Sequence, residues 1–308
     1  MSSATHKKTA TILFSHGTVE HLEDLPAFVT NIRRGHAPPQ DVVDELVRRY
    51  RAIGGRSPLG DITRWLAAKV EVRTGIRTRM AMRMWHPFPE EVLAMLVADG
   101  VERVLVVPLA QHSTSAYAES MARAKENVVA RGPAGALEIR CAKNWGSSPG
   151  LVGAFASSID EAFEKLPEAT RARTALVMTA HSVPMSVIRG GDPYERDLRE
   201  SAALIGRALR AGVGEAFVAF QSQGMGGGEW LGPDLVATLD AVAASGAAHV
   251  LFAPIGFLSD HVEVLYDLDI EAAQWARERG LTMSRAASLN ASQGFVEAVA
   301  AVIEELAR

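Results

Sequence analysis

This 308-residue sequence contains a single cysteine, Cys141. One cysteine excludes a disulfide within the chain and a zinc or iron–sulfur site built from four cysteines. The sequence also lacks an apolar run of the eighteen or so residues that a membrane span needs, so we expect no transmembrane segment. Its first residues, 1–8, lack the pattern of a signal peptide, and we therefore expect a cytoplasmic protein.

An excess of positive charge is likewise missing. The 32 lysines and arginines nearly balance the 36 acidic residues, and the formal net charge is −4. Because nucleic-acid-binding proteins depend on a basic stripe or patch, we expect no nucleic-acid partner. The composition, 48% hydrophobic and 22% charged, is that of an ordinary globular protein, and the length suits two domains of about 150 residues.

Segments typical of strands and of helices alternate along the whole chain. The predicted strands are 9–14, 76–81, 104–108, 137–141, 174–179, 216–221, 250–254 and 281–286. The predicted helices are 39–53, 59–73, 90–98, 116–130, 151–165, 194–211, 233–244, 261–279 and 292–307. This alternation predicts a layered α/β fold of parallel strands joined by crossover helices, with function at the carboxyl ends of the strands.

Two features of the first half recur in the second. Apolar strands end in His16 and in His181, and the pattern Gly-x-x-x-Val-Leu-x-x-Pro occurs at 100–108 and again at 246–254. These echoes suggest a duplicated half, with the two histidines on opposite walls of a cleft. The Gly/Ser/Pro-rich stretch 145–150 marks the boundary, which gives domains 1–148 and 149–308 and leaves the C-terminal helix able to pack on the first.

A row of acids follows the last apolar strand pattern. Glu263, Asp267 and Glu271 recur every four residues, which on an α-helix places them within roughly 80° of one another. Like charges at this spacing repel unless they face water or a cation. A solvated face is one interpretation. The other is a divalent-metal site, favoured by apolar neighbours in the same turns and by Asp260 and His261 just before them.

A glycine-rich stretch, 223–233, also allows two interpretations. It lacks the glycine patterns of nucleotide-binding loops. It is either a flexible loop or the lip of a cleft, in which Met225 and Trp230 would lie on a flat ligand.

The sequence resembles the ferrochelatase family at a series of ordered motifs that cover essentially the whole chain. The motifs are Ile-Arg-Arg-Gly at 32–35, Arg-Tyr-Arg-Ala-Ile-Gly-Gly-Arg-Ser-Pro at 49–58, His-Pro at 86–87, Thr-Ala-His-Ser-Val-Pro at 179–184, Gly-Asp-Pro-Tyr at 191–194, Gln-Ser at 221–222, Trp-Leu-Gly-Pro at 230–233, the acidic run 259–271 and Ala-Ser-Leu-Asn at 287–290. The resemblance implies two Rossmann-like domains facing across a porphyrin cleft. It also implies insertion of Fe²⁺ into protoporphyrin IX to form haem, the last step of haem biosynthesis.

The same resemblance implies roles for the histidine and the acids. His181 and Glu263 would face the centre of the macrocycle and handle both metal and protons, while Asp267 and Glu271 would line a metal path along a helix widened to a π-helix. The chemistry agrees, because metal insertion releases two pyrrole protons. A neutral imidazole accepts one near neutral pH, and a carboxylate accepts or relays the other.

Porphyrin contacts are implied at further positions. Arg33, Arg49, Tyr50 and Ser57 match positions that hold propionates in relatives using coproporphyrin, and arginine suits carboxylates through its bidentate fork. Ordinary surface charge is the alternative for the arginines. His16 is either an axial ligand to product haem or a donor on the cleft wall.

The implied substrates are a porphyrin and ferrous iron. No tightly bound cofactor is expected, and the lone cysteine excludes an iron–sulfur cluster. The assembly is expected to be a monomer or a weak homodimer. Alternative functions are a coproporphyrin III ferrochelatase, a sirohydrochlorin chelatase for cobalt or iron, and a haem carrier clamped by His16 and His181. A carrier would not need the acidic row.

Overall fold

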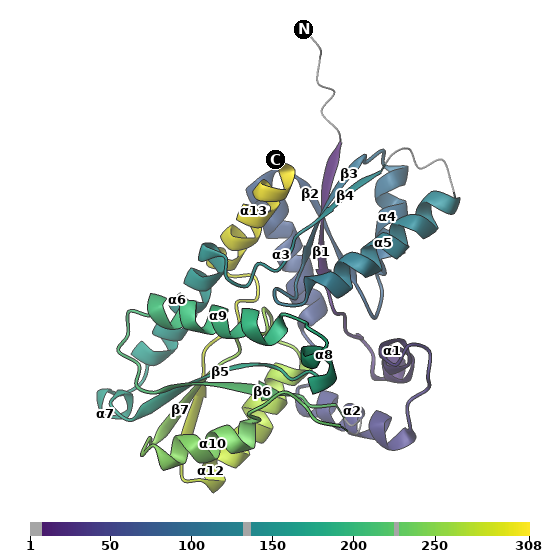
Figure 1. Ribbon diagram of the computed structural model, residues 1–308. Helices are drawn as coiled ribbons and strands as arrows, with labels where there is room; N and C mark the ends of the chain where they lie inside the picture. Colours follow the sequence, from purple (N-terminus) through teal and green to yellow (C-terminus); the bar gives the residue numbers. More distant parts are fainter. Residues whose placement is uncertain (1–7, 132–136, 225–227) are drawn as a thin grey trace. The chain divides into compact units, whose positions relative to one another are not determined.

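The computed structural model describes residues 8–131, 137–224 and 228–308 (Figure 1). The chain forms two compact units. The first consists of Met1–Arg48, Gly55–Trp145 and Ala291–Arg308, and the second of Arg49–Gly54 and Gly146–Asn290. The division into domains 1–148 and 149–308 stays a prediction. Among the described residues, no helix is long and apolar enough to cross a membrane.

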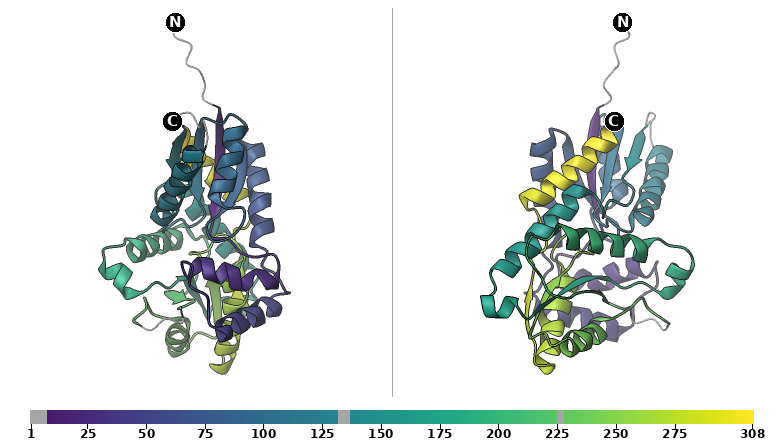
Figure 2. Two further views of the ribbon diagram at one scale, coloured as in Figure 1. Left: turned by 90° about the vertical axis from the view of Figure 1, so that its right-hand side faces the viewer. Right: turned by 60° about the vertical axis from the view of Figure 1, so that its left-hand side comes forward.

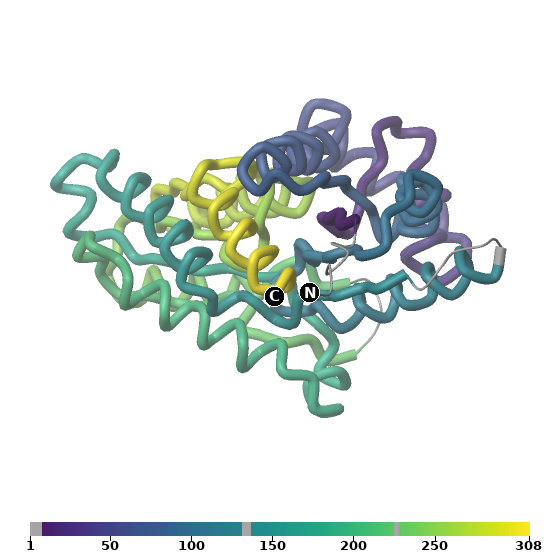
Figure 3. Tube along the Cα trace, turned by 90° about the horizontal axis from the view of Figure 1, so that it is seen from above, coloured from purple at the N-terminus to yellow at the C-terminus, as the bar shows by residue number. Residues whose placement is uncertain are grey.

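A four-stranded parallel sheet forms the centre of the first unit, in the order β2-β1-β3-β4. Its strands are β1 (Thr9–Ser15), β2 (Arg77–Met82), β3 (Arg103–Pro108) and β4 (Glu138–Cys141). The accompanying helices are η1 (Leu22–Asp24), α1 (Leu25–Ile32), α2 (Gln40–Ala52), which ends in the second unit, α3 (Leu59–Thr74), α4 (Pro89–Ala98), α5 (Thr114–Arg131) and α13 (Gln293–Ala307). Helices α4 and α5 pack together over one face, and α13 lies alongside α3 on the other (Figure 3).

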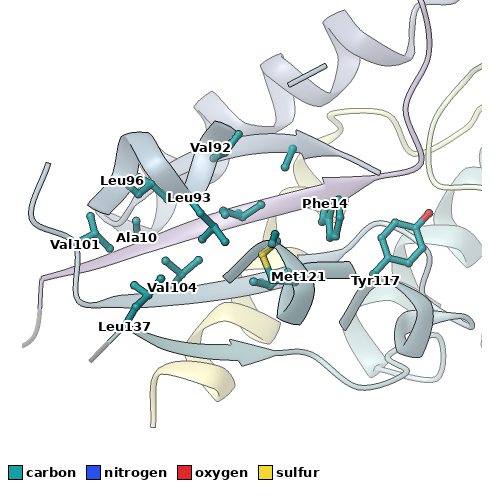
Figure 4. Packing of buried hydrophobic residues seen from close by; sticks show 14 residues of the cluster. Ala10, Phe14, Val92, Leu93, Leu96, Val101, Val104, Tyr117, Met121 and Leu137 are labelled. Carbon is teal, nitrogen blue, oxygen red and sulfur yellow. The ribbon is translucent and has the colours of Figure 1, made fainter. Parts of the chain in front are cut away.

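Strand β1 is buried from Ala10 to Ser15 because helices cover both of its faces. Its alternate residues Ala10, Ile12 and Phe14 belong to a buried cluster with residues of α4 and α5 (Figure 4). The Phe14 ring meets Tyr117 edge to face, with ring centroids 5.1 Å apart. This packing holds β1 rigidly, so that the loop after Ser15 leaves the sheet at a fixed position.

The second unit repeats this arrangement with the strand order β6-β5-β7-β8. Its strands are β5 (Thr174–His181), β6 (Ala216–Gln221), β7 (His249–Ala253) and β8 (Thr282–Arg285). Its helices are α6 (Pro149–Glu164), α7 (Glu168–Arg171), α8 (Met185–Arg189), α9 (Tyr194–Ala208), α10 (Leu235–Ala244), α11 (Val262–Leu265), the π-helical segment η2 (Asp267–Ala272) and α12 (Ala273–Glu278). Helices α6 and α9 cover one face of the sheet, and α10 and α12 cover the other (Figures 1 and 2).

The predicted α/β class is confirmed, with two parallel sheets flanked by helices. The strand order is the same in both sheets, as the sequence echoes indicate. Within the described ranges four helices were not predicted: η1, α1, α7 and α8. Of these, η1, α7 and α8 are too short to show a helical period. The helix predicted over 261–279 corresponds to three successive helical segments, α11, η2 and α12, of which η2 is π-helical.

Candidate active site

The candidate site lies at the carboxyl edge of the second sheet, where open parallel sheets bind ligands. Strand β5 ends at His181 and β6 ends at Gln221, and these two residues are paired in register. The acidic helix follows β7, the other neighbour of β5. Three chain segments distant in sequence therefore deliver polar side chains to one edge.

His181 presents a basic nitrogen to Glu263. Its Nδ1 is hydrogen-bonded to the carbonyl oxygen of Ser182, which can only accept, so Nδ1 carries the proton of the neutral ring. Nε2 is then free of a proton and lies 3.6 Å from Glu263 Oε2. The Tyr194 hydroxyl donates to the His181 carbonyl oxygen at 2.7 Å and anchors the strand end. The two side chains remain 41% and 36% exposed, so a ligand can reach the pair.

The start of the acidic helix is fixed by its flanking residues. His261 caps it, because Nδ1 accepts the backbone N–H of Glu263 at 3.1 Å. Burial lowers the pKa of His261, which favours the neutral ring that this cap requires. The carboxylate of Asp260 accepts hydrogen bonds from Ser288 and Asn290, both at 2.8 Å. Both residues that the sequence offered as additional metal ligands thus make contacts that hold the loop.

An apolar row anchors this helix in the core. The row recurs every four residues and has no exposed surface; it consists of Val264, Leu268, Ala272 and Ala276. The acids each precede a member of this row by one residue and so lie on the adjoining face. The Tyr266 carbonyl oxygen accepts from Ile270 at 3.1 Å and from Glu271 at 3.0 Å, and the second bond has the i to i+5 spacing of a π-helix. The widening implied by the family resemblance is confirmed.

Arg49 neutralises part of the acidic row. Its guanidinium nitrogens lie 3.2 Å from Asp267 Oδ1 and 3.8 Å from Glu271 Oε1, and its centre lies 5.0 Å from the Tyr266 ring centroid. Asp267 and Glu271 therefore share one face, as predicted, and their repulsion is offset by a tethered cation. The sequence offered Arg49 as a propionate ligand, and a carboxylate partner within the chain was not foreseen.

The pKa of Asp267 is raised well above the ordinary value of an aspartate. Burial, with smaller contributions from the charges of Glu263 and Glu271, raises its pKa from 3.8 to about 7. The Ser222 hydroxyl, which donates to Asp267 Oδ2, and the Arg49 charge act in the opposite direction without cancelling the effect of burial. Asp267 can consequently take up and release a proton near neutral pH.

The other predicted residues of the second unit have different environments. Tyr50 is buried, with 2% of its surface exposed. Trp230 is partly buried and bridges to Pro184, and the neighbouring Leu231 N–H donates to the Val183 carbonyl at 2.9 Å. The end of the glycine-rich stretch thus lies beside the segment that follows His181. Met225 lies outside the described residues.

The remaining predicted residues belong to the first unit. His16 is exposed after β1 and meets Phe28 edge to face at 6.3 Å, and Arg33 is exposed at the end of α1. Ser57 lines a pocket of about 370 Å³ together with Trp85 and His86. The pocket is formed by the loops after β1 and β2 and the start of α3. It lies at the carboxyl edge of the first sheet, the expected place for a ligand.

The predicted metal ligands occur as two pairs. His181 contacts Glu263, and Asp267 and Glu271 share Arg49. Across the ranges 8–131, 137–224 and 228–308, no three His, Cys, Asp or Glu side chains are gathered as in a bound-metal site. The assignment of these four residues to metal handling stays a prediction.

Two residues of the site belong to a family motif, Gln-Ser at 221–222, for which the sequence predicted no role. Gln221 donates from Nε2 to the Glu263 carbonyl oxygen at 2.6 Å, and Ser222 contacts Asp267. Ser222 has φ +60°, a left-handed conformation that is costly for a residue other than glycine and is found at functional sites. Their position at the end of a predicted strand was the signal that could have pointed to a role. The sequence does not give the order of strands in the sheet, so it could not place this strand end next to His181.

Comparison with known proteins gives consistent results. The family model "Ferrochelatase" matches residues 8–307. A ferrochelatase from Herpetosiphon aurantiacus is 33% identical over 96% of this chain and 98% of that protein. A coproporphyrin III ferrochelatase from Anoxybacillus flavithermus is 35% identical over 95% of this chain and 94% of that protein. The solved structure of SirB from Bacillus subtilis with Fe³⁺ has a TM-score of 0.62 at 14% identity, covering 97% and 96% of the two chains, which indicates a shared fold.

Proposed function

Because the chain belongs to the ferrochelatase family, and is therefore a porphyrin metal chelatase and a lyase, we propose that it inserts Fe²⁺ into protoporphyrin IX to form haem. The reaction exchanges two pyrrole protons for one ferrous ion, so the site must accept two protons and release iron from its water ligands. The His181–Glu263 pair at the carboxyl edge of the second sheet is the observation that supports this function best.

His181 acts as the first proton acceptor in this proposal. The hydrogen bond from Nδ1 to a carbonyl leaves the Nε2 lone pair available, and imidazole is the side chain whose ordinary pKa suits proton uptake near neutral pH. Glu263, 3.6 Å away, stabilises the imidazolium that forms and receives or relays the second proton. After the first transfer the imidazolium and the carboxylate compensate each other, and this compensation ends when Glu263 takes the second proton, unless that proton is relayed onward.

Asp267 and Glu271 serve as the route for iron and for protons. Carboxylate oxygens suit a hard divalent cation, and Asp267, with its pKa raised to about 7, exchanges protons at the working pH. Arg49 keeps the two carboxylates together while iron is absent. In the proposed mechanism, iron that reaches the row competes with this guanidinium for the same oxygens.

The porphyrin itself would be held by His16, Arg33, Arg49, Tyr50, Ser57, Met225 and Trp230. Arg33 is exposed, as a propionate ligand must be, whereas Arg49 is already engaged by two acids and Tyr50 is 2% exposed. In the same proposal, His16 is either an axial ligand to the iron of product haem or a hydrogen-bond donor on the wall of the cleft.

Coproporphyrin III is the second candidate substrate. Relatives at 33% to 36% identity bear the name coproporphyrin III ferrochelatase, and others at 32% to 33% are named ferrochelatase. Coproporphyrin III carries four propionates against two in protoporphyrin IX and would require more cationic or hydroxyl contacts of the kind that Arg33 and Ser57 provide.

The remaining parts of the proposal concern cofactors, assembly and location. We propose that iron enters as substrate, that catalysis needs no tightly bound cofactor or iron–sulfur cluster, and that the protein acts in the cytoplasm as a monomer or weak homodimer. The SirB structure supports the fold alone, so a sirohydrochlorin chelatase is the weaker assignment. A haem carrier is also the weaker assignment, because binding haem between two histidines does not require Glu263, Asp267 and Glu271.

The test is an anaerobic insertion assay with Fe²⁺ or Zn²⁺ against protoporphyrin IX, coproporphyrin III and sirohydrochlorin. His181→Ala and Glu263→Gln are each expected to lose at least 100-fold in kcat while retaining porphyrin binding, because removal of an acid–base group typically costs about 10² to 10⁴ in rate. Turnover of sirohydrochlorin alone would overturn the assignment. Full activity of His181→Ala would remove this residue as the required base.

A further inference from the structure

Gln221 occupies a position that the mechanism above does not use. It is the last residue of β6 and is paired in register with His181, the last residue of β5. Residues paired in this way project from the same face of a sheet, so the two side chains are neighbours. Gln221 is 2% exposed, unlike the accessible His181.

One end of the Gln221 amide holds the catalytic helix. The side-chain Nε2 donates to the Glu263 backbone carbonyl oxygen at 2.6 Å, and the backbone carbonyl oxygen of Gln221 accepts from the Ser182 N–H at 2.7 Å. Gln221 thus joins the strand end that carries His181 to the first turn that carries Glu263. Gln221 therefore links the two chain segments whose side chains make the 3.6 Å contact between His181 and Glu263.

The other end of the amide lacks a donor. The Glu263 carbonyl can only accept, so Nε2 must face it and Oε1 must point elsewhere. Oε1 is buried, and none of the described residues donates a hydrogen bond to it. A buried acceptor without a donor destabilises the folded state, and such groups in folded proteins are normally satisfied by ordered water.

We propose that Gln221 is a positioning residue for the His181–Glu263 pair and works through both ends of its amide. Nε2 fixes Glu263 against His181, and Oε1 binds one ordered water molecule beside the pair. The inference rests on the proposed roles of His181 and Glu263 and extends them to a residue that touches neither iron nor porphyrin. Water held there is available to carry protons released at the pair.

The first test replaces the amide by a group of similar length without donors or acceptors, Gln221→Met. Steady-state Zn²⁺ insertion is measured with porphyrin binding followed separately by absorbance. We expect kcat to fall about 10- to 100-fold, since small misplacements of catalytic groups have effects of this size, with KM and Kd for porphyrin within twofold of wild type. The Gln221→Asn side chain is one methylene shorter and cannot reach both the Glu263 carbonyl oxygen and the ordered water. It should show the same fall in kcat.

A matched control loses a buried hydrogen bond elsewhere in the second unit. Thr238→Val removes the hydroxyl that donates to the Asp234 carbonyl at 2.7 Å, at a residue 2% exposed on α10. Its kcat should stay within twofold of wild type even where its melting temperature falls. A kcat for Gln221→Met within twofold of wild type would overturn the proposal.

A double-mutant cycle separates positioning from a merely structural role. If Gln221 acts through Glu263, Gln221→Met should reduce the residual kcat of Glu263→Gln by less than threefold. An equal loss in both backgrounds would mean that the two residues act independently and would overturn the positioning role. Wild-type protein without turnover on any porphyrin would refute the proposed function instead.

The water position has a readout that does not depend on activity. A crystal structure of the metal-free wild type should show an ordered water within about 3.2 Å of Gln221 Oε1. The Gln221→Met structure should lack it. A dry Oε1, or one satisfied by a protein donor, would overturn this half of the proposal.

Discussion

Replacing Asp267 by asparagine should reveal a pH-dependent destabilisation built into the acidic row. The carboxyl is 4% exposed and its pKa is raised, chiefly by burial, from 3.8 to about 7. A raised pKa means that the folded state binds the proton more tightly than the unfolded state does. The stability from this group is therefore fully present below pH 3.8 and is lost as pH rises to about 7.

The size of the effect follows from the shift. At 1.36 kcal/mol per pKa unit, a rise from 3.8 to about 7 corresponds to about 4 kcal/mol in total. More than a third of this is already lost at pH 5, so about 2–3 kcal/mol should disappear between pH 5 and pH 8. Asparagine has a similar shape and does not titrate in this range.

The measurement is urea unfolding of wild type and Asp267→Asn in metal-free buffer at several pH values from 5 to 8. The difference between the two proteins at each pH isolates residue 267, because other titrating groups are common to both. The variant should gain about 2–3 kcal/mol relative to wild type over this range. A difference that stays constant within about 0.5 kcal/mol would show that Asp267 is ionised throughout and would refute the reasoning.

Three further outcomes are expected. Leu268→Ala, which empties a fully buried position under the π-helical turn, should lower the free energy of unfolding by about 2–5 kcal/mol, whereas Ile270→Ala, at a site 38% exposed, should cost under about 1 kcal/mol in the same urea titration. Ser222→Gly should be more stable than Ser222→Ala by about 1 kcal/mol, because both lose the hydroxyl but only glycine relieves φ +60°; equal stabilities would exclude strain at this turn. Arg49→Gln should raise the Asp267 pKa above about 7, since the guanidinium lowers it; carboxyl-carbon NMR titration measures this, and an unchanged pKa would show that the ion pair does not form in solution.

Most of the secondary structure could be predicted because the local signals agree with the fold. Strands such as β1 and β7 are covered by helices on both faces, and their apolar runs, 12–14 in β1 and 250–253 in β7, are visible in sequence. Helix α1 was missed since its eight residues begin with Leu25 and Pro26 and carry few polar positions from which a period could be read. The π-helical turns were not visible in the four-residue repeat of the acids and came from the family resemblance alone.

The candidate site divides in a similar way. His181, Glu263, Asp267 and Glu271 could be named from sequence because a histidine at a strand end and acids at regular spacing are local patterns. The partners of these residues are distant in sequence: Arg49 reaches the row across 218 positions, and Gln221 reaches Glu263 across 42. Such contacts depend on strand order, which places β6 and β7 on either side of β5.

The sequence by itself determined the α/β class, the acidic row and the family to which the chain belongs, because each is written in residue types at short, regular spacings. Only the tertiary structure decided the protonation chemistry of the row. The pKa of Asp267 depends on burial by segments that are distant in sequence. It also depends on the Arg49 charge and the Ser222 hydroxyl, which belong to other parts of the chain and lower it. Electrostatic energy falls with distance through space and not along the chain, so a pattern in sequence fixes which groups exist and folding fixes what they do.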